Sequence, residues 1–429
     1  MNPENRNMIL AITLSMAVLF GWQMFVVGPE LEKEAAMQQA IAEQEAAAAA
    51  ASGDAPQVDP GAVAESAGAA ATGQLSASEA APAVEAPRIV IDAPLVSGSI
   101  SLAGLRVDDI MLRAYQETQD PDSKNIQFLL KTSTASPFFA EFGWASADAA
   151  QPMPKSDSVW TASSMVLSPG SPVTLTWENG NGLTFRRQLS INDNYMITVD
   201  DSVQSALSAP LTLFPYGLVR RHGTPATTGI YILHEGALGV FDETLREEDY
   251  DDMRDADGGV SEIRPEMPGG WIGFTDKYWL AALLPDQSAN MNFAFKSLAG
   301  PSDRYQVDYI ASEASVLPAG GVVSSQTRLF AGAKKVSLLD GYADELGIAN
   351  FDLAIDFGWF YFLTKPFFYA INWLNGLLGN FGLAVLAFTI VVKLVFFPLA
   401  NKSYRSMGKM RVLSPKIQEI RERHADDRM

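Results

Sequence analysis

The residue whose type and position most suggest a function is a lysine among apolar residues. Lys393 lies in the stretch FTIVVKLVFFPL and is the only charged residue of Phe381–Leu399, a block of 19 residues. A charge at the centre of a bilayer costs about 2.5–3.5 kcal/mol on insertion scales, so such charges are rare and often functional. A simpler interpretation stays open, because Lys393 lies four residues before Phe397, or about 6 Å along a helix. Its ammonium could extend to the headgroups as an anchor.

Two further residues share the helical face of Lys393. Thr389 lies one turn earlier, and Gly382 lies eleven residues before Lys393, which is close to three full turns. Thr389 would extend a polar surface along this face. The three residues therefore form the candidate site.

Other patterns that could carry chemistry are weaker. His222 follows two arginines and could act as an acid–base group, but no nucleophile motif or paired carboxylates accompany it, so we expect a polar loop between strands. The segment DETLREEDYDDMRDADGG fails the EF-hand pattern, because Met253 and Arg264 occupy ligand positions in the register that ends at Asp257–Gly258. A solvated acidic loop is expected instead. The absence of cysteine excludes disulfides and thiolate metal sites.

The charge distribution places the candidate site beside a membrane. Residues 400–429 carry eight basic and four acidic side chains. The net charge of the chain is −19, and residues 30–351 alone have a net charge of −23. An acidic middle and a basic tail thus lie on opposite sides of the apolar block Phe357–Leu399, as the positive-inside rule expects. The acidic residues within the tail argue against binding to DNA.

The chain is expected to begin with a membrane anchor in residues 1–28. Met8–Val27 is a run of 20 uncharged residues, about 30 Å as a helix, which matches the bilayer core. A cleavable signal peptide is the alternative, but its apolar run would be about 7–15 residues with a small-x-small site behind it. Residues 29–87 are rich in Ala, Pro and Glu, lack the large apolar residues of a core, and predict a flexible linker.

Residues 88–346 predict a large antiparallel β-sandwich. Short runs alternate between apolar and polar residues, and the turn ENGNG joins two of them as a hairpin. The alternating residues of that hairpin are Val173, Leu175, Trp177, Leu183 and Phe185. The segment PGGWIGFTDKYW, Pro268–Trp279, is expected to pack its aromatic side chains on a sheet face.

Residues 347–379 predict an amphipathic helix that lies in the membrane interface. Its polar face holds Tyr361, Lys365, Asn372 and Asn375 at steps of 4, 7 and 3, and Pro366 is expected to kink it. Trp359 and Trp373 suit the headgroup layer. If this helix lies on the surface, residues 380–400 form the second span, and both termini are cytoplasmic with the acidic domain outside. If it spanned instead, the domain would face the cytoplasm, so the interfacial interpretation is simpler.

Residues 401–429 predict a further helix. An apolar stripe includes Met410, Leu413, Ile417 and Ile420, and Ser414 and Pro415 suit the N-cap and first helical positions. The stripe has no partner helix in the sequence, which suggests a chain that is truncated at its C-terminus.

The C-terminal run resembles the YidC membrane protein insertase family of Gram-negative bacteria. The resemblance rests on four motifs in the same order: the predicted interfacial helix that contains KP, the sequence GNFG at the start of the second span, a basic residue followed by FFPL, and KSYRSMGKMRVLSPKIQEIRERHADD. Upstream, GGWIGFTDKYW and LFAGAKKVSLLDGY also match. It implies an all-β periplasmic supersandwich, transmembrane and interfacial helices, and an inner-membrane location. It also implies a hydrophilic groove in which Lys393, where many members have Arg, attracts polar parts of a membrane protein during insertion.

Further expectations follow from the same resemblance. It implies that the tail forms the first helix of a cytoplasmic hairpin, with the residues Met410, Arg411, Leu413, Pro415, Ile417 and Ile420. The implied partners are nascent membrane proteins, the lipid bilayer, the Sec translocon and the ribosome, with no cofactor and no enzymatic reaction. The family has more spans after the hairpin, which supports the interpretation as a truncated chain. The alternative function is a membrane-tethered periplasmic binding or scaffold protein.

Overall fold

The computed structural model describes residues 86–423 apart from 121, 147, 149–150, 228–232, 299–302 and 359. The predicted N-terminal anchor, nearly all of the predicted linker, and Trp359 therefore lie outside the described residues. The described chain belongs to two compact units, of which one ends at Phe360 and the other begins at Tyr361. Each is described by itself below.

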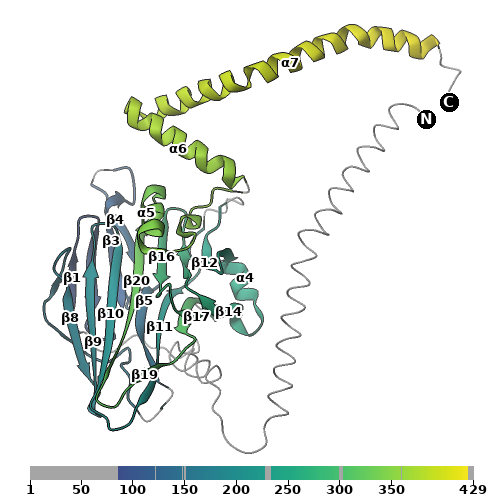
Figure 1. The fold of residues 1–429 in the computed structure, drawn as a ribbon. Coiled ribbons are helices and arrows are strands. Elements are labelled where there is room, and N and C mark those ends of the chain that lie inside the picture. Colours follow the sequence, from purple (N-terminus) through teal and green to yellow (C-terminus); the bar gives the residue numbers. More distant parts are fainter. Residues whose placement is uncertain are drawn as a thin grey trace, which may run out of the picture. The chain divides into compact units, whose positions relative to one another are not determined.

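The first unit is a sandwich of two large sheets (Figure 1). The sheet of 11 strands has the order β14 (Val260–Pro268), β17 (Asn290–Leu298), β18 (Arg304–Ala311), β11 (Leu211–His222), β5 (Phe138–Ser146), β3 (Val107–Gln116), β2 (Val96–Ser101), β1 (Arg88–Asp92) and β7 (Val166–Leu167), with β19 (Ser315–Leu317) beside β11 and β4 (Asn125–Leu129) beside β3. The sheet of nine strands has the order β13 (Thr244–Asp249), β12 (Gly236–Phe241), β15 (Trp271–Thr275), β16 (Trp279–Leu284), β20 (Val322–Ala333), β10 (Met196–Ser205), β9 (Leu183–Ile191), β8 (Val173–Glu178) and β6 (Thr161–Ala162).

The predicted hairpin is confirmed as β8 and β9, which pair antiparallel with Trp177 opposite Phe185. The turn between them forms for local reasons. Gly180 and Gly182 adopt positive φ angles of 73° and 91°, which glycine reaches without steric cost. The Asn179 side chain accepts hydrogen bonds from two backbone amides beyond it, at 2.7 and 2.9 Å. The alternating pattern of the strands then directs one row of side chains into the core.

The core lies between the two sheets and is rich in aromatic side chains. The segment Pro268–Trp279 contributes Trp271 and Phe274, both almost completely buried, which confirms the expected packing for these two side chains, whereas Tyr278 of the same segment is exposed. Trp271 contacts Phe351 edge-on at 5.3 Å, and its indole N–H donates to the Ala349 carbonyl at 3.2 Å. One end of the sandwich is thereby closed by the helical segments α5 (Val336–Leu346) and η3 (Phe351–Ala354).

Two expectations about loops were wrong. His222 is the last residue of strand β11 rather than part of a loop. The strand holds charged residues because they find partners there, for example Arg220 with Gln306 at 2.8 Å. The acidic segment is also structured, as strand β13, helix α4 (Tyr250–Asp255) and the turn η2 (Asp257–Gly259). Asp249 caps α4 by accepting from two backbone amides, and Tyr250 is buried against the core.

The second unit contains helix α6 (Tyr361–Leu378) and helix α7 (Phe381–Arg423). The break between them follows from two adjacent residues. Gly379 has a φ angle of 66°, which ends α6, and the Asn380 side chain caps α7 by accepting from the Leu383 amide at 3.1 Å. The helix start expected at Ser414 and Pro415 was wrong, because α7 continues through both. A proline removes one intrahelical hydrogen bond and can kink a helix without ending it.

Candidate substrate-contact face of α7

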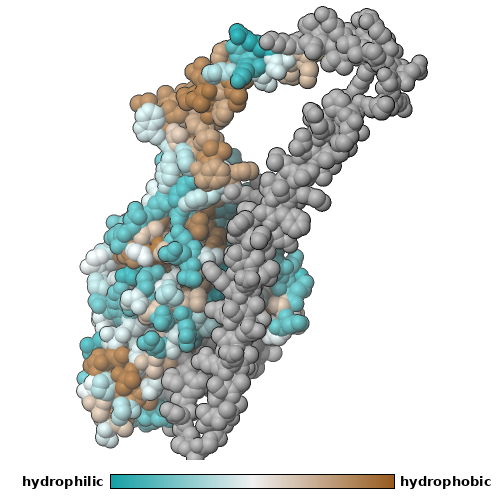
Figure 2. Space-filling model, turned by 45° about the vertical axis from the view of Figure 1, so that its right-hand side comes forward, coloured by the Kyte–Doolittle hydropathy of each residue, from teal (hydrophilic) through white to brown (hydrophobic). Residues whose placement is uncertain are grey.

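Helix α7 contains the one segment of the described chain that is long and apolar enough to cross a membrane. This segment is Phe381–Met407, 27 residues. At about 1.5 Å per residue it exceeds the roughly 30 Å of a bilayer core. Figure 2 shows hydrophobic residues over α6 and the first part of α7, whereas the sandwich surface is mostly hydrophilic.

Helix α6 packs on one side of α7 through small and aromatic residues. Ala384 has an exposed fraction of 0%, because its small side chain faces the neighbouring helix. One turn further on, the rings of Phe388 and Phe367 lie 5.1 Å apart, edge to face. The side of α7 that carries Ala384 and Phe388 is therefore occupied.

Lys393 lies on the opposite side of α7. It follows Ala384 by nine residues, which at about 100° per residue is half a rotation of the helix. Thr389 and Gly382 lie with Lys393 on this side, and all three are exposed. The Thr389 hydroxyl donates to the Val385 carbonyl at 2.8 Å, so it leaves its oxygen lone pairs on the surface. The structure thus brings the three residues of the candidate site onto one uncovered face.

The rest of this face is apolar. Leu386, Ile390 and Phe397 flank Lys393 and are exposed. Among the residues that the structure describes, none forms an ion pair with Lys393. A single cation between large apolar side chains requires either water or an anionic group within reach.

Three of the residues predicted for the interfacial helix, Lys365, Pro366 and Trp373, lie in α6, and Trp359 lies outside the described residues. The Lys365 ammonium donates to the Tyr361 hydroxyl at 3.1 Å and lies 5.3 Å from the centre of that ring. Pro366 is inside the helix, and Trp373 is 68% exposed. Phe362, Pro366, Trp373 and Leu377 are exposed along one stripe. This stripe gives α6 an apolar, aromatic surface suited to lipid contact.

The residues expected in the cytoplasmic helix all lie within α7. They are Met410, Arg411, Leu413, Pro415, Ile417 and Ile420. Met410 is exposed, and the other five side chains are outside the described ones. Their roles stay predictions.

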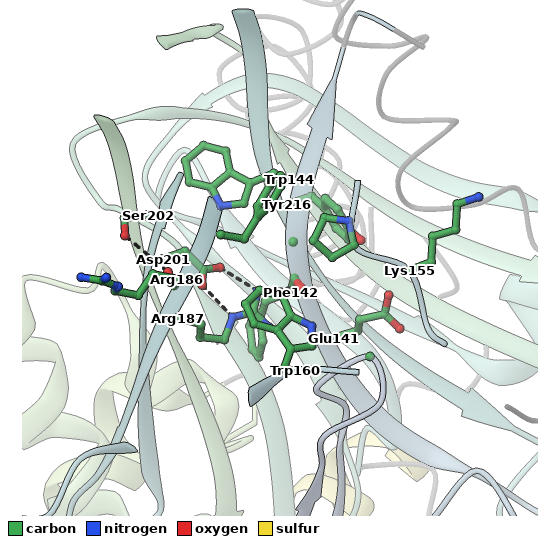
Figure 3. Close-up of a pocket in the computed structure, with 14 residues that line it drawn as sticks. Glu141, Phe142, Trp144, Lys155, Trp160, Arg186, Arg187, Asp201, Ser202 and Tyr216 are labelled. Carbon is green, nitrogen blue, oxygen red and sulfur yellow. Dashed lines mark hydrogen bonds and ion pairs between the residues drawn. The ribbon is translucent and has the colours of Figure 1, made fainter. Parts of the chain in front are cut away.

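A second feature that could bind a ligand is a cavity in the sandwich, which sequence reasoning missed. Figure 3 shows Trp144, Trp160 and Tyr216 around an ion pair between Arg187 and Asp201. The cavity measures about 20 Å³, which is room for roughly one water molecule, whereas small-molecule sites usually need about 300–1,000 Å³. A cavity of this volume has room for a water molecule but not for a small-molecule ligand.

Arg187, beside the cavity, forms an ion pair within one sheet and a hydrogen bond to the other. Arg187 donates to both carboxylate oxygens of Asp201 at 2.6 and 2.7 Å, and to the Phe142 carbonyl of the other sheet at 2.8 Å. Burial lowers the pKa of Arg187 and the Asp201 carboxylate raises it, with a net upward shift. One signal for Arg187 was available, because it occupies the inward-facing row of β9 between Phe185 and Leu189.

A β-sandwich joined to an apolar helix that is long enough to span a bilayer defines a class of membrane protein with a large extramembrane domain. The model for the YidC periplasmic domain matches residues 88–370, and the model for the 60Kd inner membrane protein matches residues 373–429. The chain therefore belongs to the YidC membrane protein insertase family. The family supports a periplasmic location for the β-domain, and an insertase function at the inner membrane.

Individual relatives agree with this assignment. The membrane protein insertase YidC of Beijerinckia indica subsp. indica is 43% identical over 433 residues, which cover 100% of this chain and 71% of that protein. That of Methylobacterium sp. (strain 4-46) is 43% identical over 452 residues, with 100% and 72% covered. Among solved structures, a galactose mutarotase related enzyme from Lactobacillus acidophilus has 9% sequence identity and a TM-score of 0.38. The match covers 57% of this chain and 97% of that chain, and the similarity is too low to support an inference.

Proposed function

We propose that Lys393, Thr389 and Gly382 line a hydrophilic groove that receives polar segments of a membrane protein during its insertion. The observation that supports this proposal is the position of Lys393 on the side of α7 that α6 leaves uncovered. An anionic side chain or a backbone carbonyl of the substrate would approach the ammonium there. The substrate's apolar helix would then move into lipid, driven by hydrophobic transfer.

The size of this effect depends on how much water the groove holds. Two unit charges 4 Å apart attract by about 1 kcal/mol in water and about 4 kcal/mol at an effective dielectric constant near 20. A wet groove lies between these limits. The attraction offsets part or all of the roughly 2.5–3.5 kcal/mol that a charge costs in the membrane, so no nucleotide or cofactor is required.

The topology proposed with this function has two spans, an interfacial α6, both termini in the cytoplasm and the β-domain in the periplasm. The charge distribution supports it, because the basic tail of residues 400–429 favours the cytoplasmic side. The domain limits are proposed as 1–28, 29–87, 88–346, 347–379, 380–400 and 401–429, except that residues 347–360 belong with the sandwich, because Phe351 packs against Trp271. In this topology the tail faces the cytoplasm, where the ribosome and the Sec translocon are proposed partners, and the protein acts by binding rather than by covalent catalysis.

The experiment must separate a groove charge from an anchor at the membrane edge. Cells depleted of their own insertase would express a full-length version, which carries the further spans of the family, with Lys393→Arg, Lys393→Ala, or a relocated charge, Lys393→Val with Val395→Lys. Val395 is two residues away, so the charge moves by about 200° around the helix but only about 3 Å in depth. Protease accessibility then measures insertion of a small phage-coat-like substrate.

The groove proposal expects Lys393→Arg to retain insertion. Lys393→Ala and the relocated charge should both slow insertion at least about fivefold, the equivalent of 1 kcal/mol or more. An anchor would function equally well after relocation, because depth and charge are kept. Normal insertion by the relocated variant would therefore refute the groove.

A further inference from the structure

An aromatic and basic cluster lies at one end of the sandwich. Asp276–Trp279 forms the turn between β15 and β16, closed by a hydrogen bond from the Asp276 amide to the Trp279 carbonyl at 2.9 Å. Tyr278, at the tip, is 58% exposed. Among the aromatic side chains that the structure describes between Arg88 and Ile355, it alone is exposed. Such an exposed ring on a rigid turn suggests a contact surface.

Two lysines accompany the aromatic rings. The Lys277 ammonium lies 5.0 Å from the centre of the Tyr278 ring, and the Lys335 ammonium lies 5.9 Å from that of Tyr115. Tyr115 in turn contacts Trp279 edge-on at 4.9 Å. We name Tyr115, Lys277, Tyr278, Trp279 and Lys335 the exit-end surface.

The nearby carboxylates have partners within the domain. Asp276 forms an ion pair with Arg221 at 2.7 Å, and Glu235 accepts from the Lys277 backbone amide at 3.1 Å. Lys335 is exposed. The ammonium groups of Lys277 and Lys335 therefore remain available to an external anion.

The exit-end surface lies where the chain leaves the sandwich. Lys334 donates its backbone N–H to the Tyr278 carbonyl at 2.9 Å, and its ammonium interacts electrostatically with Asp356. The six residues between η3 and α6 have a reach of at most about 20 Å. The end of the sandwich that carries this surface is thus tied by a short connection to the unit that contains the membrane span.

We propose that the exit-end surface binds the headgroup layer of the membrane, with Tyr278 and Trp279 at the level of the glycerol groups and Lys277 and Lys335 on anionic phosphates. Tyrosine and tryptophan prefer this layer because one part of each ring is apolar and the other forms hydrogen bonds. Lysines near the surface of an anionic bilayer gain attraction as well. The sandwich is then held against the bilayer in a defined orientation. This inference goes beyond the groove and rests only on membrane attachment through α7.

The test uses the absence of cysteine from the sequence, which makes a single introduced cysteine a unique labelling site. The full chain with Tyr278→Cys carries an environment-sensitive fluorophore in vesicles of phosphatidylglycerol and phosphatidylethanolamine, or of phosphatidylcholine alone. Asn181→Cys is the matched control. Asn181 is exposed in the turn before β9. Asn181 lies at the end of the sheet where β20 begins, and Tyr278 lies near the end where β20 finishes. The 12 residues of β20 separate these two ends of the sheet by about 36 Å.

The expected result is a blue shift and quenching by headgroup-level doxyl lipid at position 278 in anionic vesicles, with neither change at position 181. Replacing Lys277 and Lys335 by glutamine in the labelled chain should lower the equilibrium constant for contact between the labelled surface and the bilayer about fivefold for each lysine. High salt should weaken the contact as well.

The proposal is overturned if the two labels behave alike, or if the label at 278 stays in water in anionic vesicles. A response that requires an added inner-membrane protein would also overturn it, in favour of a protein partner. Lys393→Ala should leave the label response unchanged, so this proposal and the groove proposal can fail separately. Because the label replaces Tyr278, the replacements of Lys277 and Lys335 test the basic part of the exit-end surface separately from the aromatic ring.

Discussion

The buried pair between Arg187 and Asp201 allows a sharp prediction about stability. Both side chains are nearly excluded from water, with exposed fractions of 3% and 10%. In the variant Arg187→Leu, the Asp201 carboxylate and the Phe142 carbonyl both lose their charged donor. We expect the sandwich to lose stability mainly through the stranded carboxylate rather than through the lost packing of the arginine.

The magnitude follows from burial and from the adjacent cavity. Removing one partner of a buried ion pair usually costs about 3–5 kcal/mol, because an uncompensated charge stays inside. The neighbouring cavity of about 20 Å³ can admit a water molecule to the freed carboxylate. We therefore expect a loss near the lower end, about 3 kcal/mol. The double variant Arg187→Leu with Asp201→Leu should lose less than the single one, since no charge is left behind.

The assay is equilibrium urea unfolding of the full chain in detergent micelles, followed by the β-sheet signal in circular dichroism. The matched control is Arg113→Leu, which breaks the exposed pair with Asp92 at 2.6 Å, whose side chains are 40% and 61% exposed. That pair should contribute about 0–1 kcal/mol. The reasoning fails if Arg187→Leu costs no more than Arg113→Leu, or if the double variant is as unstable as the single one.

Two further predictions concern the same domain. Burial lowers the pKa of Lys334 to about 8, although nearby carboxylates act in the opposite direction. Between about pH 8 and 10.5 the unfolded state binds more protons at this lysine than the folded state, so the stability of the fold should rise with pH in that range. Lys334→Met should abolish this rise, which thermal unfolding as a function of pH would measure. A Cβ on Gly332 would lie 2.2 Å from the Tyr195 ring, so Gly332→Ala should cost about 1–3 kcal/mol in urea unfolding. Gly341→Ala, in α5 with nothing within 4 Å, should instead gain about 0.5–1 kcal/mol, and equal effects of the two alanines would contradict this account.

The features that could be predicted from the sequence are those determined by nearby residues. The β8–β9 hairpin follows from alternation and from the turn residues between Trp177 and Leu183. The break before α7 follows from Gly379 and Asn380, whose conformation and capping are local. The common face of Lys393 and its two neighbours follows from helical periodicity alone.

What could not be predicted depends on pairings between distant residues. Arg220 belongs to a strand because Gln306, 86 residues away in sequence, accepts its hydrogen bonds. The inward direction of Arg187 was readable from the alternation, but its partner Asp201 follows only from the register of β9 and β10. The side of α7 that α6 covers likewise depends on the geometry of the connection, which periodicity does not determine.

The geometry of α7 bears on how a protein could promote insertion without an energy source. A groove charge attracts a substrate only if the protein does not neutralise it, and no described residue forms an ion pair with Lys393. The flanking Leu386, Ile390 and Phe397 keep most of the surrounding surface apolar, so a helix that has delivered its polar end meets only the Thr389 hydroxyl as a further polar contact and can leave into lipid. A second charge on this face would bind the substrate more tightly and would also slow its release. On this reasoning, a single cation beside one hydroxyl group, on a face that is otherwise apolar, suits the groove proposed for Lys393.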